Sequence, residues 1–186
     1  MSLVNVRSAS LVSSAAALGV AGSLHAGLLG STLTAQYFAY GGPYNGRGTY
    51  ANGVVNGTVL GQFPGFYSIA ANDTQVTFDF SVSVGGTWSF SEVSLNSDGL
   101  FIRNGTTVSF AGAPAITGVT IDASSNMVGL DQSRITFNAG ALAVDWMDLG
   151  WDSNTRVVLN INTVPAPGAV ALLGFAGALG GRRRRA

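Results

Sequence analysis

A strict alternation of apolar and polar side chains in residues 75–84 constrains the fold more than any other feature of this sequence. Because successive side chains of a strand point to opposite faces, this pattern predicts a strand with one buried and one solvated face. No stretch of residues 27–163 keeps the 3.6-residue period of an amphipathic helix. The apolar positions are Val76, Phe78, Phe80, Val82 and Val84.

Short segments of the same character recur through the rest of this region, separated by residues that favour turns. One such turn is Asn56-Gly57, between β-branched residues, and another break is Gly85-Gly86. This spacing predicts an all-β domain, a single antiparallel β-sandwich of jelly-roll type. The further expected strands are residues 33–40, 88–95 (with a bulge near Ser91-Glu92), 100–110, 115–122, 134–138, 142–147 and 156–162, and residues 54–59 are expected to form a hairpin at the Asn-Gly turn.

Residues 100–110 are expected to fold back on themselves at Asn104-Gly105. A two-residue loop would leave Leu100 and Ile102 facing water, whereas a three-residue loop would pair Ile102 with Val108 and bury both. Because a slip of one residue reverses every side chain, the register that buries more apolar surface should be the stable one. We therefore expect the three-residue loop.

The composition fits an exported β-domain and excludes some partners. Only 10% of the residues are charged, and the chain has 26 glycines and no cysteine, so packing rather than disulfides must stabilise it. Residues 27–165 contain four arginines against nine acidic residues, a difference of −5. An acidic surface binds phosphates poorly, so nucleic acid is not an expected partner.

The residue types of the domain argue against catalysis. The single histidine, His25, precedes the domain, which contains neither cysteine nor lysine. This removes the serine–histidine and cysteine–histidine nucleophile systems, as well as histidine-ligated zinc. Glu92 is the only glutamate, and no spacing of carboxylates suggests a glycosidase pair. We expect no enzyme activity and no cofactor.

Residues 145–154 carry an unusual cluster of oxygen-bearing side chains. Asp145, Asp148, Asp152 and Asn154 could supply ligands to Ca²⁺, but their spacing matches no calcium loop. A solvated turn, in which these side chains bond nearby backbone, is the preferred interpretation, so no metal site is expected. Trp146 continues the apolar alternation of its strand and should be buried.

Aromatic residues suggest a second interpretation of the domain, as a carbohydrate-binding module. An apolar ring face complements the C–H face of a sugar, so exposed rings can form a glycan platform. Tyrosines also pack in strands with their hydroxyls at the surface, which needs no ligand. The candidates are Trp151 and Tyr44, together with Tyr37, Tyr40 and Tyr50.

Residues 1–26 have the pattern of a secretory signal peptide. Arg7 supplies a positive charge, residues 11–24 are largely apolar, and cleavage is expected between Ala26 and Gly27. An alternative cleavage site lies at Val20-Ala21-Gly22. An uncleaved anchor is disfavoured because the apolar segment is short for a membrane span.

Residues 164–186 form a tail with three parts. The first is Val164-Pro165-Ala166-Pro167-Gly168, in which the prolines end the preceding structure. An uncharged run to residue 181 follows, about 21 Å long as a helix, which is shorter than a bilayer core of about 30 Å. The last part is Arg182, Arg183, Arg184 and Arg185, which should hold this end on the cytoplasmic side and stop transfer.

This tail resembles the PEP-CTERM sorting signal of bacterial envelope proteins. In that family a proline-glutamate-proline motif precedes a short apolar segment and a terminal arginine cluster; here Ala166 stands in the place of the glutamate. The resemblance implies processing at the outer face of the membrane by exosortase, an integral membrane protease or transpeptidase. Signal peptidase and an exosortase-like enzyme are thus the expected processing partners, with transient membrane anchoring by the tail.

The sequence as a whole therefore predicts three parts: a signal peptide at 1–26, a β-sandwich domain at 27–163 and a sorting tail at 164–186. It favours an exported protein of the cell envelope or extracellular matrix with a structural or adhesive, non-catalytic role. The alternative is a carbohydrate-binding module presented at the surface, with polysaccharide as its partner.

Overall fold

The computed structural model describes residues 27–44 and 49–164, which fold entirely into β-structure. The described part contains no α-helix, and a 3-10 turn (Gln132–Arg134) precedes β12. The strands are β1 (Thr32–Ala39), β2 (Gly42–Pro43), β3 (Thr49–Val54), β4 (Val59–Phe63), β5 (Tyr67–Ala71), β6 (Gln75–Asp79), β7 (Gly86–Thr87), β8 (Ser94–Leu95), β9 (Phe101–Ile102), β10 (Gly105–Ala111), β11 (Ile116–Ile121), β12 (Ile135–Phe137), β13 (Ala141–Asp145), β14 (Gly150–Trp151) and β15 (Arg156–Thr163).

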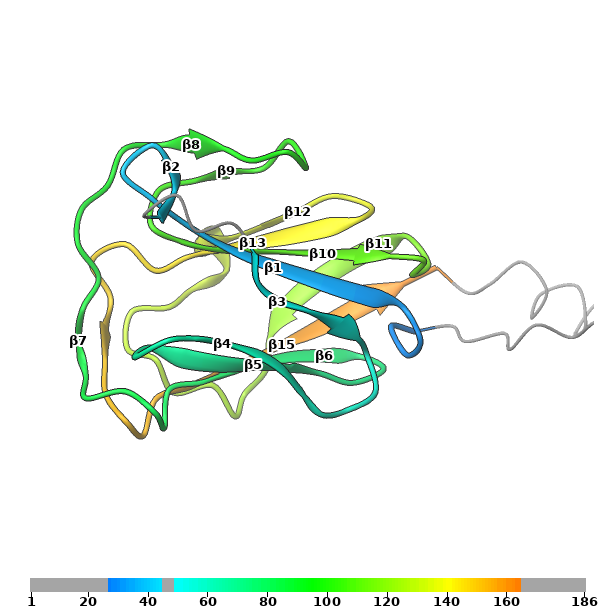
Figure 1. Cartoon of the computed structure of the whole chain (residues 1–186), viewed down its shortest axis with the longest axis horizontal. Helices are drawn as coiled ribbons and strands as arrows, with labels where there is room; N and C mark the ends of the chain where they lie inside the picture. The colour runs from blue at the N-terminus through cyan, green and yellow to red at the C-terminus, as the bar shows by residue number, and fades with distance from the viewer. Residues whose placement is uncertain (1–26, 45–48, 165–186) are drawn as a thin grey trace, which may run out of the picture.

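Most of these strands belong to one antiparallel sheet that is nearly closed into a barrel. The order is β11-β15-β6-β5-β4-β3-β1-β10-β13-β12, with β2 beside β1. The two end strands, β11 and β12, lie close together, and the Ile116 amide donates across the gap to the Ala139 carbonyl at 2.9 Å. Figure 1 shows one half of the sheet (β1, β10, β13 and β12) facing the other (β4, β5 and β6). The all-β, antiparallel prediction is confirmed, in the form of one continuous curled sheet.

The core lies between these two halves and is rich in aromatic rings. Trp146, Tyr67, Phe78 and Phe80 are its largest fully buried side chains, so the predicted burial of Trp146 is confirmed. The ring centroids of Phe78 and Trp146 lie 5.3 Å apart, with the planes almost perpendicular. Edge-to-face pairs of this kind stabilise the folded state by more than the burial of their apolar surface alone would.

The strand predicted over residues 75–84 is shorter than its alternation suggested. Val76, Phe78 and Phe80 are buried as expected, but β6 ends at Asp79, and Val82 and Val84 are exposed. The chain turns here because the Asp79 carboxylate accepts from the Ser81 amide at 2.9 Å, and the Ser83 amide donates to the Phe80 carbonyl. Alternation beyond a turn no longer specifies a buried face.

The predicted bulged strand over residues 88–95 is also wrong. Trp88 is buried, but Phe90, Val93 and Leu95 are exposed. Only the two-residue pieces β7 and β8 pair here, β7 with β14 and β8 with β9. The chain between β7 and β8 runs along one end of the barrel without strand partners (Figure 1).

The hairpin predicted at Asn104-Gly105 does not form. β9 pairs with β8, while β10 pairs with β1 and β13, so neither the two-residue nor the three-residue loop is correct. The preferred face is nevertheless right, since Leu100 and Ile102 are buried and Phe101 is exposed. Gly105 serves close packing instead, because a Cβ there would lie 1.9 Å from the Val144 carbonyl oxygen.

Four of the remaining strands follow the sequence closely, whereas the bounds of β3 and β4 and the whole of β5 were not predicted. β11, β12, β13 and β15 fall within one or two residues of their expected bounds, and the Asn56-Gly57 turn joins β3 to β4. At this turn the Asn56 side-chain oxygen accepts from the Thr58 amide at 3.0 Å, and Gly57 has a φ of 87°. At this position the turn could be predicted from the local sequence alone, because Asn and Gly favour turns.

The two ends of the barrel differ in what they carry. The described chain begins just before β1 and finishes just after β15 at the same end of the barrel (Figure 1). β2, β7 and the turn between β4 and β5 lie at the opposite end. This second end holds the candidate site.

Candidate ligand-binding cleft

Four of the five aromatic residues proposed from the sequence line one hollow at the end of the barrel. Tyr37, Tyr40, Tyr44 and Trp151 surround a space of about 180 Å³. A second hollow of about 390 Å³, lined by the fifth candidate, Tyr50, shares Tyr37, Tyr44 and Phe63 with it as a common wall. The two hollows together are called the aromatic cleft below.

A row of stacked rings forms the back of the aromatic cleft. Tyr37 stacks on Phe63 with centroids 4.3 Å apart, and Phe63 stacks on Phe66 at 4.8 Å. Phe66 then stacks on Trp88 at 5.0 Å, and Trp88 on Trp151 at 4.1 Å. Since these rings cover one another's faces, the row is a rigid wall rather than a set of free stacking surfaces.

Trp151 is half-buried in this wall and does not stand free at the surface. Its ring lies over its cross-strand partner Gly86, where a Cβ would approach the indole to 2.9 Å. Its N–H donates to the Ser83 hydroxyl at 2.7 Å. One indole face is therefore taken by Trp88 and the nitrogen by Ser83, which leaves Trp151 little freedom to move.

Tyr40 and Tyr44 are the rings set at the mouth of the aromatic cleft. Tyr44 meets Tyr37 edge-on at 5.6 Å, and the centroids of Tyr40 and Tyr44 are 6.2 Å apart. Tyr40 is 63% exposed, whereas Tyr44 is half-buried. These two rings keep faces that are not covered by the stacked row.

Tyr40 is held in place from both ends. Its backbone amide donates to the Ser91 hydroxyl, and its phenol hydrogen-bonds the Ser89 hydroxyl at 2.8 Å. Its φ is 56°, in the left-handed region that bulky side chains rarely adopt. Backbone strain of this kind clusters at functional sites.

Asn104 connects the rings to the segment between β7 and β8. Its side-chain oxygen accepts a hydrogen bond from the Tyr37 hydroxyl, and its Nδ2 donates one to the Ser89 carbonyl at 2.8 Å. The side chain is almost wholly buried. The sequence analysis assigned Asn104 to a turn and missed this role. It also missed the part that Phe63, Phe66 and Trp88 play in the aromatic cleft. The one sequence signal for these rings was the Phe-Pro-Gly-Phe run of residues 63–66, which places two aromatic residues at a turn.

Three hydrogen-bonded phenols lie in and behind the wall of the aromatic cleft: Tyr37 and Tyr50 line it, and Tyr67 is fully buried. The Tyr67 hydroxyl hydrogen-bonds Thr106, and the Tyr50 hydroxyl donates to Thr106 at 3.2 Å. Burial raises the pKa of Tyr67 to about 12, although the bonds from Thr106 and Tyr50 oppose this. Burial likewise raises the pKa of Tyr37 and of Tyr50 well above the usual range, so all three phenols stay neutral.

Two of the four residues weighed as calcium ligands accept hydrogen bonds from nearby backbone. Asp145 accepts from the Met147 amide at 3.0 Å, and Asp152 from the Asn154 amide at 2.8 Å. Within residues 27–44 and 49–164, no three acidic, histidine or cysteine side chains are grouped so as to hold a metal ion. The geometry is that of side chains closing local turns.

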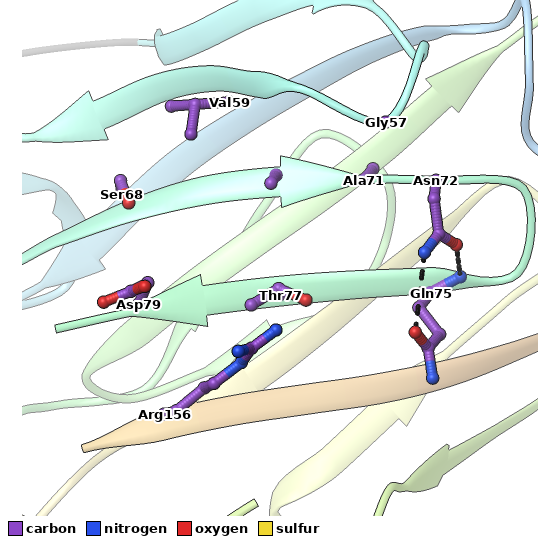
Figure 2. Close-up of a pocket in the computed structure, with 10 residues that line it drawn as sticks. Gly57, Val59, Ser68, Ala71, Asn72, Gln75, Thr77, Asp79 and Arg156 are labelled. Atoms are coloured by element: carbon purple, nitrogen blue, oxygen red, sulfur yellow. Dashed lines mark hydrogen bonds between the residues drawn. The ribbon is translucent and has the colours of Figure 1, made fainter. Parts of the chain in front are cut away.

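A third hollow, of about 240 Å³, lies on the outer face of the sheet and is polar. Figure 2 shows Arg156 reaching from β15 toward Thr77 on β6, next to Asp79. Hydrogen bonds from Ser81 hold the pKa of Asp79 below its usual value, and Arg156 adds a smaller effect. None of the described residues that line this groove carries an aromatic ring.

The sorting residues fall largely outside the described chain. Ala26, Pro165, Ala166, Pro167, Gly168 and the arginines Arg182 to Arg185 lie beyond it, and only Gly27 and Val164 are inside. Among the residues that the structure describes, no helix has the length and apolar character to cross a bilayer.

Comparison with known proteins gives no relative: no family model, no curated protein and no solved structure matches this chain.

Proposed function

We propose that this chain is an exported, non-catalytic protein of the cell envelope or extracellular matrix, whose β-domain is adhesive and binds glycan in the aromatic cleft. The domain is a sandwich-like, flattened barrel between a signal peptide and a sorting tail. The observation that carries the proposal is the meeting of Tyr37, Tyr40, Tyr44 and Trp151 around one hollow. Apolar clefts with a few fixed polar groups are the usual form of small-ligand sites.

The position of the aromatic cleft suits a surface role. β15, the strand before the sorting tail, finishes at the end of the barrel opposite to β2 and β7 (Figure 1), and Thr87 of β7 lines the aromatic cleft. While the tail still holds the domain at the membrane, before processing, the aromatic cleft would point outward. A purely structural protein would need no such orientation.

Glycan binding is tested with the protein purified from the envelope or medium. Immobilised polysaccharides should retard it in affinity electrophoresis, and Tyr44→Ala should reduce the retardation in a variant whose circular dichroism spectrum is that of the folded domain. If no polysaccharide retards the protein, the structural role without a ligand is the better assignment.

Export is tested by intact-mass measurement of the same material. We expect an amino terminus at Gly27 and a carboxyl terminus near residues 165–168, made by signal peptidase and an exosortase-like enzyme. Recovery of the chain with Met1 retained would exclude the signal peptide.

A further inference from the structure

The geometry points to an uncharged polysaccharide as the ligand: we propose that the aromatic cleft holds two consecutive sugar units, one on each side of Tyr44, and that Tyr40 stacks on the chain from outside. This inference rests on the proposed glycan binding and specifies its substrate class. Three independent features of the aromatic cleft support it.

The first feature is charge. Among residues 27–44 and 49–164, no acidic or basic side chain lines either hollow; the polar lining that they supply consists of hydroxyl and amide groups. Uronic and sulfated glycans are normally bound by arginine, whose guanidinium pairs with carboxylate or sulfate. The acidic balance of the domain would repel such polymers further. The lining of the aromatic cleft therefore matches a neutral polysaccharide better than an acidic one.

The second feature is the division of the aromatic cleft. Tyr37, Tyr44 and Phe63 border both hollows, which therefore lie next to each other and not on separate faces. Each hollow has its own polar side chains, Thr87 and Ser89 in the smaller one and Thr49 and Gln62 in the larger. This repeat of ring and hydroxyl-or-amide groups fits two neighbouring units of one polymer.

The third feature is Tyr40. A glycine would adopt its positive φ without strain, and a ring that is 63% exposed contributes little burial. Folding alone therefore favours another residue at this position. A tyrosine whose amide and hydroxyl are both fixed by serines is, however, preorganised to present its ring to a ligand.

Proline-rich peptides also dock in aromatic grooves, but the polar groups here fit them less well. A proline-rich helix offers carbonyl acceptors and few N–H donors. The hydroxyls of Thr87 and Thr49 and the amide of Gln62 can each donate and accept, and a sugar hydroxyl also does both. The chemistry of the lining therefore favours the sugar.

The test uses the full exported protein and titration calorimetry with defined probes. These are a neutral glucan and a neutral mannan, an acidic polygalacturonate, a proline-rich decapeptide, and mono-, di- and trisaccharides of whichever neutral polymer binds. We expect a neutral polymer to bind and the acidic polymer and peptide not to bind. The disaccharide should bind at least tenfold more tightly than the monosaccharide.

Variants connect the binding to Tyr40. Tyr40→Gly should weaken binding of the neutral polymer at least tenfold while the melting temperature stays within a few degrees. Phe101→Ala, which removes an exposed ring that lines neither hollow, should leave the affinity unchanged. Full affinity in Tyr40→Gly would overturn the assignment of this residue.

The remaining outcomes separate the two proposals. If the acidic polymer binds as tightly as the neutral ones, the glycan function stands and the uncharged class is wrong. If monosaccharide and disaccharide bind equally, the two-unit cleft is wrong. If only the peptide binds, or nothing does, the proposed glycan function fails together with this inference.

Discussion

At the residue scale, Phe78 and Thr77 are neighbours with opposite environments. Phe78 is fully buried against Tyr67 and Trp146, whereas Thr77 lies half-buried on the outer face. We expect Phe78→Ala to lower the free energy of unfolding by about 3–5 kcal/mol, because it opens a cavity in the core. Thr77→Ala, the matched control, should change it by less than about 0.5 kcal/mol. Equal losses in urea denaturation would mean that the faces of β6 are reversed.

The buried phenols predict sensitivity to alkali. The unfolded chain loses protons from its tyrosines near pH 10, whereas Tyr67 keeps its proton up to about pH 12 when folded. The unfolded state therefore binds fewer protons, and stability falls as the pH rises through this window. Each such phenol contributes a slope of at most about 1.4 kcal/mol per pH unit. Urea denaturation at pH 9 and pH 11 measures this, and Tyr67→Phe should flatten the slope.

At the scale of elements, Gly105 decides whether β10 can approach β13. A Cβ at this position would lie 1.9 Å from the Val144 carbonyl oxygen, which is backbone and cannot turn away. Gly105→Ala should therefore lower the free energy of unfolding by about 1–3 kcal/mol or more. Gly140→Ala is the control, since nothing lies within 4 Å of its Cβ, and should change it by less than about 0.5 kcal/mol. Similar melting temperatures for the two variants would contradict this packing.

At the scale of the whole molecule, the arginine cluster should decide how far the chain is exported. The apolar residues of the tail favour insertion by only roughly 2–3 kcal/mol in total, while each arginine opposes passage by about 2.5–3.5 kcal/mol. Deleting Arg182 to Arg185 should let the chain pass unprocessed and keep residues up to 181. Intact-mass measurement of the exported protein tests this. Normal cleavage near residues 165–168 in the deletion variant would show that the arginines do not arrest the chain.

Sequence patterns were informative where the structure depends on neighbouring residues. In β15 the alternation of Val157, Leu159 and Ile161 correctly marked the buried face, and Asn56-Gly57 marked a turn. The same reasoning failed after Asp79, where alternation continues but the chain turns away from the sheet. A local pattern reports which side chains can share a face, and does not report whether a sheet is present to cover it.

The sequence by itself determined the all-β class, most core faces and the aromatic residues worth testing, because side-chain alternation and turn chemistry act over a few residues. Only the tertiary structure decided which strands pair and which rings meet. Tyr40 is bonded to Ser89, 49 residues away, and Tyr37 to Asn104, 67 residues away. Such contacts depend on how the curled sheet brings distant segments to one end of the barrel. The aromatic cleft exists for that reason, and no short stretch of the chain encodes it.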